Sequence, residues 1–394
     1  MQYLEIVYFV LQFLFTIHLA FPLVLLLLYL ISPSKKFIKA SKEYDFAAII
    51  TAYKETEIVI PLVDSLQKQN YKKYIIYIVA DECDTELLNY SNDNIVLLKP
   101  RSKIGSKVKS IDFAVKNFIR NHDALIIFDS DNLAHPDFLL NVNTFFNEGF
   151  KAVQGERKAK NLETSYACLD EARDIYYNFY DRLVMFNVGS SSSLAGSGMA
   201  FDVKLYNNCL NPENIVGGFD KILQANIISS GQKIAYAKKA VIYDEKVSKS
   251  AQLEKQRTRW INSWFKYFIL GFGIFFRGIF SLDFNKTLFG FLLLRPPLFI
   301  FILPSVIILA VNYFVSLYMF YTVIIFFVIF IITFLLSLVL NKTDARVWKS
   351  LFSIPLFVFR QVLSLFHLKK ANKQFLETEH THLVYIEDVL EDIK

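Results

Sequence analysis

Residues 124–128, Ala-Leu-Ile-Ile-Phe, form an apolar run that ends in Asp129-Ser130-Asp131. Five apolar residues closed by carboxylates predict a buried parallel strand, and open α/β sheets bind their ligands at the C-terminal edge of such strands. Two carboxylates one residue apart suit a hard divalent cation, and such a cation can neutralise a diphosphate. The stretch therefore predicts an α/β sheet with a metal and phosphate site at its edge.

The surrounding sequence repeats the same pattern of short apolar runs and helical stretches. Residues 46–50, 74–79 and 95–98 are further apolar runs, and the segments 59–69 and 108–121 between them have helical character. Strands separated by helices imply right-handed βαβ crossovers and a mostly parallel sheet. We therefore expect one α/β domain over residues 44–264.

The composition calls for membrane segments beside this domain. Of the 394 residues 54% are hydrophobic, which is too apolar for a purely soluble protein. The formal net charge is +6 and the basic residues are spread along the chain, so we expect no nucleic-acid partner. Cys83, Cys168 and Cys209 lack CxxC spacing, which predicts neither a disulfide nor a zinc site.

The N-terminal segment is expected to be a retained transmembrane helix. Residues 4–31 are apolar over more than the roughly 20 residues that one crossing needs, and no small-residue cleavage site follows. Basic clusters stay on the cytoplasmic side of a membrane. Because four lysines come directly after the helix, we expect the α/β domain to be cytoplasmic. These lysines are Lys35, Lys36, Lys39 and Lys42.

Beyond Trp264 the sequence is again typical of a membrane protein. Residues 288–313 and 317–340 each predict a spanning helix, and together they form a hairpin in which Arg295 snorkels to the cytoplasmic interface. The segments 265–280 and 351–368 carry charges that favour an interfacial position. The chain then has three or four crossings in the inner membrane. Its expected parts are a transmembrane helix (1–32), a cytoplasmic domain (44–264), interfacial and transmembrane helices (265–370) and a cytoplasmic tail (371–394).

Loops at the ends of the expected strands carry side chains suited to a nucleotide. Tyr53 and Glu55 follow the first strand and Asp81 follows the second. An aromatic ring can stack on a base, and carboxylates accept hydrogen bonds from a base or ribose. The basic loop 101–107 opens a helix and suits phosphate, although it lacks the P-loop spacing.

In order and spacing these motifs resemble the family 2 glycosyltransferases of GT-A fold over residues 45–265. The resemblance is closest to the membrane-embedded branch with cellulose, hyaluronan and poly-N-acetylglucosamine synthases. It implies a Rossmann-like, mixed and mostly parallel sheet flanked by transmembrane helices. It also implies that Asp129 and Asp131 bind Mg²⁺ or Mn²⁺ and that Tyr53, Glu55 and Asp81 line the nucleotide pocket.

Further motifs support the resemblance, although some of their residues differ from the family pattern. Lys107 falls in a segment similar to the family's GKxxALN and would contact the donor, although Ser106 and Asp112 replace the usual glycine and asparagine. The loop around Gly198 resembles one that lies near the sugars. The family's TED-type motif corresponds to residues 218–221, which makes Asp220 the expected catalytic base, with Phe219 where glutamate is common. The stretch 243–246, Tyr-Asp-Glu-Lys, also resembles the family and is expected to order its loop.

The last motif, residues 256–260, fits the family's QxxRW through Gln256, Arg259 and Trp260. A guanidinium grips a diphosphate with parallel hydrogen bonds, so we expect Arg259 to hold the leaving group. A tryptophan face suits a sugar, so we expect Trp260, Gln256 and Gly198 on the acceptor side.

Together these features predict an inverting transferase that moves a sugar from a nucleotide-sugar, expected to be a UDP-sugar, to a glycan or lipid-linked acceptor at the membrane. One alternative is a transferase that adds a single sugar, and another is a non-catalytic membrane subunit of a polysaccharide export complex. A phosphohydrolase of the HAD type needs a Gly-Thr after its DxD, whereas Asn132-Leu133 stands here. With three or four crossings, a polymerase would need a second copy or an export partner.

Overall fold

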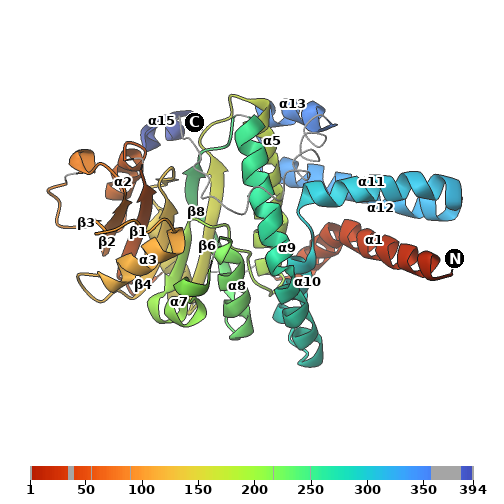
Figure 1. The fold of residues 1–394 in the computed structure, drawn as a ribbon, viewed down its shortest axis with the longest axis horizontal. Coiled ribbons are helices and arrows are strands. Elements are labelled where there is room, and N and C mark those ends of the chain that lie inside the picture. The colour runs from red at the N-terminus through yellow and green to blue at the C-terminus, as the bar shows by residue number, and fades with distance from the viewer. Residues whose placement is uncertain are drawn as a thin grey trace.

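The computed structural model describes residues 2–33, 40–54, 56–88, 90–215, 217–248, 250–355 and 383–392. A curved sheet with helices on both faces makes up one side of the molecule, and long helices project from the other (Figure 1). The strands are β1 (Phe46–Tyr53), β2 (Tyr74–Asp81), β3 (Ile95–Leu98), β4 (Ala124–Asp129), β5 (Leu133–Ala134), β6 (Ala152–Ala159), β7 (Met199–Asp202) and β8 (Ile234–Asp244).

Within the described residues these strands form one mixed sheet in the order β3-β2-β1-β4-β7-β6-β8-β5. The pairs β1/β2, β1/β4, β2/β3 and β6/β8 are parallel, whereas the pairs that contain β7 or β5 are antiparallel. Six strands therefore run in one direction and two run against it. The predicted mostly parallel sheet is confirmed, and its first four strands lie where the apolar runs place them.

Helices on both faces bury the sheet. They are α2 (Val59–Gln67), α3 (Lys107–Lys116), α4 (Phe138–Asn147), α5 (Ser165–Tyr177), α6 (Met185–Asn187), α7 (Val203–Cys209) and α8 (Phe219–Ser229), with short turns η1 (Glu86–Leu88) and η3 (Pro212–Asn214). Apolar residues of α3 and α8 belong to one core cluster, and those of α2 and α4 to the other. Because β1 and β4 contribute alternate residues to both clusters, their sequence is continuously apolar.

The α5 helix continues into a π-helical segment, η2 (Asn178–Val184), that joins the sheet domain to the apolar helices. The Tyr180 hydroxyl donates to the carbonyl oxygen of Thr333. Asp181 forms a buried ion pair with Arg295. The expectation that Arg295 snorkels to the interface is therefore wrong, because its charge is neutralised by Asp181 inside the protein.

The remaining helices are α1 (Gln2–Ile31), α9 (Ser250–Phe280), α10 (Phe284–Leu294), α11 (Leu298–Val315), α12 (Leu317–Leu340), α13 (Ala345–Ser350), η4 (Leu351–Ser353) and α15 (Ile386–Asp392). The expected single helix over residues 288–313 is divided, because Pro296 and Pro297 lack the backbone N–H that a continuous helix requires. Most of the expected segment 351–368 lies outside the described residues.

Two described helices are long and apolar enough to cross a membrane, namely the stretches Glu5–Ile31 and Leu317–Leu340. Phe284–Leu294 and Phe301–Val315 are shorter apolar helices. The helices α1, α11 and α12 lie along one direction, whereas α9 runs across it beside the sheet domain (Figure 1). One side of α9 exposes apolar residues at helical spacing, namely Phe265, Ile269, Phe272, Phe276 and Ile279.

Candidate active site

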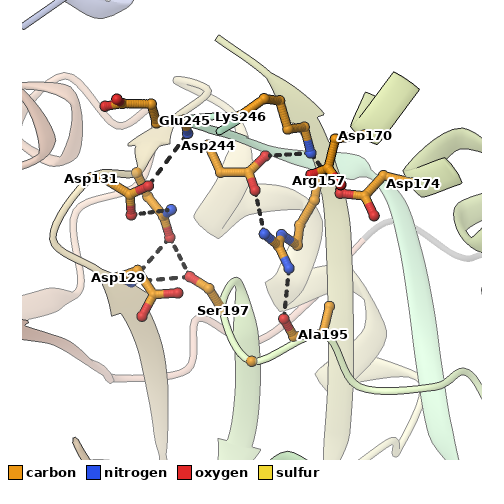
Figure 2. Close-up of polar contacts among 12 residues, drawn as sticks. Asp129, Asp131, Arg157, Asp170, Asp174, Ala195, Ser197, Asp244, Glu245 and Lys246 are labelled. Carbon is orange, nitrogen blue, oxygen red and sulfur yellow. Dashed lines mark hydrogen bonds and ion pairs between the residues drawn. The ribbon is translucent and has the colours of Figure 1, made fainter. Parts of the chain in front are cut away.

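The carboxylates of the Asp-Ser-Asp stretch lie at the C-terminal end of β4, as the apolar run predicts. The backbone N–H of Asp129 donates to Asn132 Oδ1 and to Ser197 Oγ, each over 3.0 Å. The hydroxyl of Ser197 also bonds Asn132 Oδ1, so the turn after β4 is fixed against the loop that precedes β7 (Figure 2). This loop contains the expected Gly198, whose φ of 62° suits glycine.

The side chain of Asp129 forms an ion pair with Lys107. Lys107 Nζ also donates to the carbonyl oxygen of Gly196 over 2.8 Å, so one ammonium group links α3, β4 and the glycine loop. Burial alone would raise the pKa of the Asp129 carboxyl, but the positive charges of Lys107, Arg157 and Arg259 outweigh it and hold that pKa below its ordinary value. Asp129 is therefore ionised, and Arg259 lies close enough to contribute.

The side chain of Asp131 is hydrogen-bonded to the residue that follows β8. Its Oδ2 accepts from the backbone N–H of Glu245 over 3.3 Å, as Figure 2 shows. Its carbonyl oxygen accepts from Lys160 Nζ over 3.0 Å, and this lysine also lies 3.6 Å from Glu245 Oε2. The position of the second carboxylate thus depends on where β8 ends.

Asp129 and Asp131 fit a hard divalent cation that also binds substrate phosphates. They supply carboxylate oxygens, which Mg²⁺ and Mn²⁺ prefer, and Asp129 is held ionised. Among the described residues no group of three or more His, Cys, Asp or Glu side chains could hold a metal ion. A cation at these two residues would therefore complete its ligands with water and phosphate oxygens.

Residues expected at the nucleotide pocket lie where β1 and β2 end. Tyr53 OH accepts from Lys103 Nζ over 2.7 Å, and hydrogen bonds from Tyr53 and Lys103 lower the pKa of the Glu82 carboxyl. Both oxygens of Asp81 accept backbone N–H groups, from Ile104 over 2.9 Å and from Gly105 over 2.7 Å. Asp81 thus fixes the basic loop, and the expected Glu55 lies outside the described residues.

Asp220 lies in the first turn of α8, on the side of Lys107 opposite to Asp129. The helix begins after Gly217 and Gly218, which have φ values of 70° and 65°, and Phe219 packs under the ammonium group of Lys107 at 5.5 Å from the ring centroid. The side chain of Asp220 is about one-fifth exposed, with Lys221 Nζ 3.7 Å away. Lys107 therefore stands between Asp129 and the turn that carries Asp220.

The QxxRW residues occupy the first turns of α9. Arg259 is exposed, whereas Arg257 is buried in an ion pair with Asp170. The guanidinium carbons of Arg173 and Arg257 lie 4.5 Å and 4.6 Å from the centroid of the Trp260 ring. Sugar stacking on Trp260 stays a prediction, because two cations already lie over its ring.

Buried polar atoms without a hydrogen-bond partner also occur on α9. The Gln256 Oε1 and Trp264 Nε1 atoms are buried and have none among the described residues. Buried polar groups normally find a partner. The two atoms lie on the helix that the sequence assigns to the acceptor side.

The profile described as "Glycosyltransferase like family 2" matches residues 44–263. The chain belongs to this family. It is a glycosyltransferase with a mixed α/β, GT-A-like sheet domain. No curated protein matches it.

One solved structure supports the fold, and a second is similar over part of the chain. The mannosyltransferase PcManGT from Pyrobaculum calidifontis, in complex with GDP-Man and Mn²⁺, is 13% identical with a TM-score of 0.57, over 90% of this chain and 97% of that one. S. aureus TarS (residues 1–349) in complex with UDP-GlcNAc is 16% identical with a TM-score of 0.40, over 62% of this chain and 79% of that one.

A buried ionic network beside the site is a feature of this glycosyltransferase that sequence reasoning missed. Arg157 forms an ion pair with Asp244 and donates to the carbonyl oxygen of Ala195 over 2.7 Å. Lys246 Nζ lies 3.0 Å from Asp244 Oδ1 and 2.5 Å from Asp174 Oδ2 (Figure 2). It also lies 3.2 Å from Glu171 Oε2. The network connects the glycine loop, β6, β8 and α5. Its only sequence signal is the stretch 243–246, for which an ordering role was expected.

Proposed function

We propose that this glycosyltransferase is metal-dependent and inverting, and that it moves a sugar from a nucleoside diphosphate donor to a glycan or lipid-linked acceptor at the membrane. The proposal is carried by one observation. Ionised Asp129 lies with Asp131 at the C-terminal end of β4, and Lys107 joins Asp129 to the loop of Gly196, while Asp131 is bonded to the backbone of Glu245. Carboxylates and an ammonium group in one place suit a diphosphate bound together with a cation.

The diphosphate end is formed by four residues. A bound Mg²⁺ or Mn²⁺ would neutralise charge on the departing diphosphate, and Asp129 and Asp131 would hold it. Lys107 and Arg259 supply positive charge on the protein side, where donors aimed at developing negative charge favour departure of the leaving group. The base and ribose would lie against Tyr53 and the loop that Asp81 fixes.

Asp220 is the proposed general base. It is the acidic residue in the first turn of α8. It directly follows Phe219, whose ring contacts the ammonium group of Lys107. A carboxylate there would accept the proton of the acceptor hydroxyl while that oxygen attacks the anomeric carbon from the side opposite the diphosphate. One displacement inverts the anomeric centre, so an α-linked donor gives a β-linked product.

The acceptor is proposed to lie between the glycine loop and α9. Gln256 Oε1 is buried without a partner among the described residues, and a sugar hydroxyl there would donate to it. Trp260 stands one turn further along α9. Gly198 is buried, with its N–H bonded to Ile127 and its carbonyl oxygen to Gly155, so it would act on the acceptor side through the shape of the loop before β7. This side of the site adjoins the apolar helices, so the acceptor would be bound near the bilayer surface.

The membrane arrangement belongs to the proposal. Residues 44–264 would form the cytoplasmic catalytic domain, and α1 and α12 would span the inner membrane, with α11 beside them. The exposed apolar side of α9 would lie in the interface, since an amphipathic helix running across the spanning direction buries its apolar side at the headgroup boundary. A second copy or an export partner would be needed for a long polymer.

Release of nucleoside diphosphate tests the proposal. The full chain in mild detergent with Mn²⁺ or Mg²⁺ would be offered a panel of UDP-sugars and GDP-mannose, with membrane lipids and oligosaccharides as acceptors. We expect release with one donor, lost on metal chelation and in Asp131→Ala. Sizing of the product separates a polymerase from a transferase of single sugars. No release with any donor would favour the non-catalytic membrane subunit.

A further inference from the structure

The described residues near the C-terminal end of the sequence return to the catalytic domain. The helix α15 (Ile386–Asp392) lies beside α2 at the edge of the sheet (Figure 1). Ile386 and Val389 are 1% and 6% exposed. Glu387 forms an ion pair with Lys68, which follows α2. The helix is therefore packed on the domain through buried apolar residues.

The surface that α15 covers is one face of the β5–β8 ribbon. Leu133 pairs with Tyr243, and Ala134 pairs with Ile242. Because side chains alternate along a strand, Ala134 and Ile242 belong to a main core cluster, whereas Leu133 and Tyr243 form a separate cluster with α15. The described residues of this separate cluster are Leu133, Val241, Tyr243, Ile386 and Val389, with Val384 and Leu390 packed against them.

This ribbon carries Asp131. Leu133 follows Asp131 by two residues, and Tyr243 precedes Glu245 by two residues. The backbone N–H of Glu245 is the group that donates to Asp131 Oδ2. The strand β5 has only two residues and lies at the sheet edge. Its few backbone hydrogen bonds to β8 therefore hold the nearby Asp131 only weakly.

We infer that α15 is a positioning element of the donor site, which holds Leu133 and Tyr243 together and thereby holds Asp131 in place for the cation and diphosphate. The inference rests on the proposed role of Asp131 and adds a part of the chain that no motif assigns to the site. It makes the donor affinity depend on a segment that follows the membrane helices in sequence. Residues that orient metal ligands typically change metal affinity by about 10- to 100-fold when they are replaced.

The test compares three full-length proteins in detergent. The double variant Ile386→Asp with Val389→Asp places charges on the buried side of α15, and Glu391→Ala changes an exposed residue of the same helix as a control. UDP or GDP binding is titrated against Mn²⁺ concentration. We expect the Mn²⁺ concentration for half-maximal binding to rise about tenfold in the double variant, with the KM for the acceptor unchanged. A form lacking residues 383–394 should behave as the double variant does.

Amide hydrogen exchange gives a second, independent reading of the same proteins. Release of α15 should raise exchange at residues 131–134 and 241–246 while α3 and α8 keep their protection. Unchanged Mn²⁺ dependence in a double variant whose α15 has been released would overturn the inference. If the wild type itself binds the nucleotide without regard to Mn²⁺, the proposed metal role has failed. In that case amide exchange at residues 131–134 alone tests whether α15 holds the β5–β8 ribbon. Equal exchange there in the wild type and the double variant would show that it does not.

Discussion

Lys107 is the residue that connects the parts of the site. It pairs with Asp129, donates to Gly196 and lies over Phe219. The sequence motifs predicted that Asp129 and Lys107 bind the nucleotide-sugar donor. They lie close together because both motifs are at the same edge of the sheet. Their direct ion pair was not predictable, because it depends on the rotamers of two side chains from separate elements.

Lys107→Met should weaken nucleoside diphosphate binding by about 10- to 100-fold. The change removes a positive charge at the diphosphate, and an interaction of this kind inside a protein is strong. Titration of the purified protein with UDP and GDP measures the effect. Lys109→Met is the matched control, since Lys109 lies on the same helix in an exposed ion pair with Glu213. Equal affinities in the two variants would contradict the role of Lys107.

Glu171 in the buried network should make stability depend on pH. Burial raises the pKa of its carboxyl from the ordinary 4.5 to about 7, although the positive charge of Lys246 acts to lower it. Between these values the folded state keeps a proton that the unfolded chain has released. The free energy of unfolding therefore falls as pH rises through this window, by at most about 1.4 kcal/mol per pH unit.

Glu171→Gln removes this titration. Relative to wild type, the melting temperature of the variant should rise as pH increases through the same window, from about pH 4.5 to about pH 7. Glu163→Gln, at an exposed carboxylate before the same helix, should keep a constant difference from wild type. A Glu171→Gln curve parallel to wild type over the whole window would show that Glu171 titrates normally.

At the scale of elements, the helical hairpin of α9 and α10 is held by close glycine contacts. A Cβ on Gly290 would lie 2.6 Å from Phe275 Cα, and a Cβ on Gly278 would lie 2.6 Å from Thr287 Oγ1. Small residues let two helix backbones approach closely. The hairpin connects the QxxRW turns to the apolar helices, so its packing would position the proposed acceptor side.

Gly290→Ala should lower the free energy of unfolding by about 1–3 kcal/mol, because the new methyl group meets the backbone of α9. Gly273→Ala is the control on the facing helix, where a Cβ meets nothing within 4 Å. It should be neutral or stabilising by up to about 1 kcal/mol, since alanine favours helix more than glycine. Thermal unfolding in detergent compares the two. A similar change in both variants would mean that the hairpin is loosely packed.

Elements with a strong periodic signal were predictable, and those defined by tertiary contacts were not. The strands β1 to β4 and the helix α12 lie where apolar runs predict them, since burial of a strand on both faces, or the lipid contact proposed for α12, requires a continuous apolar sequence. The two-residue β5, the π-helical η2 and the docking of α15 have no local signature. They exist because distant segments pack on them, and a single sequence gives no sign of such contacts.

At the scale of the whole molecule, the proposed topology has the sheet domain on one side of a membrane and the turn between α11 and α12 on the other. Tyr318 beside this turn is 82% exposed. Tyr318→Cys should react with a membrane-impermeant thiol reagent in intact cells, whereas Cys83 of the sheet domain should react only after lysis. Labelling of Cys83 in intact wild-type cells, or no labelling of the Tyr318→Cys variant until lysis, would reverse the proposed topology.

The central claim is that Asp220 removes the acceptor proton in a site whose donor end is built by other residues. Transfer of radiolabelled sugar and binding of nucleoside diphosphate should be measured on the same preparations of wild type and Asp220→Asn. We predict that transfer falls by more than about a thousandfold in the variant while nucleotide affinity stays within about twofold of wild type. Transfer at a comparable rate in Asp220→Asn would contradict the account.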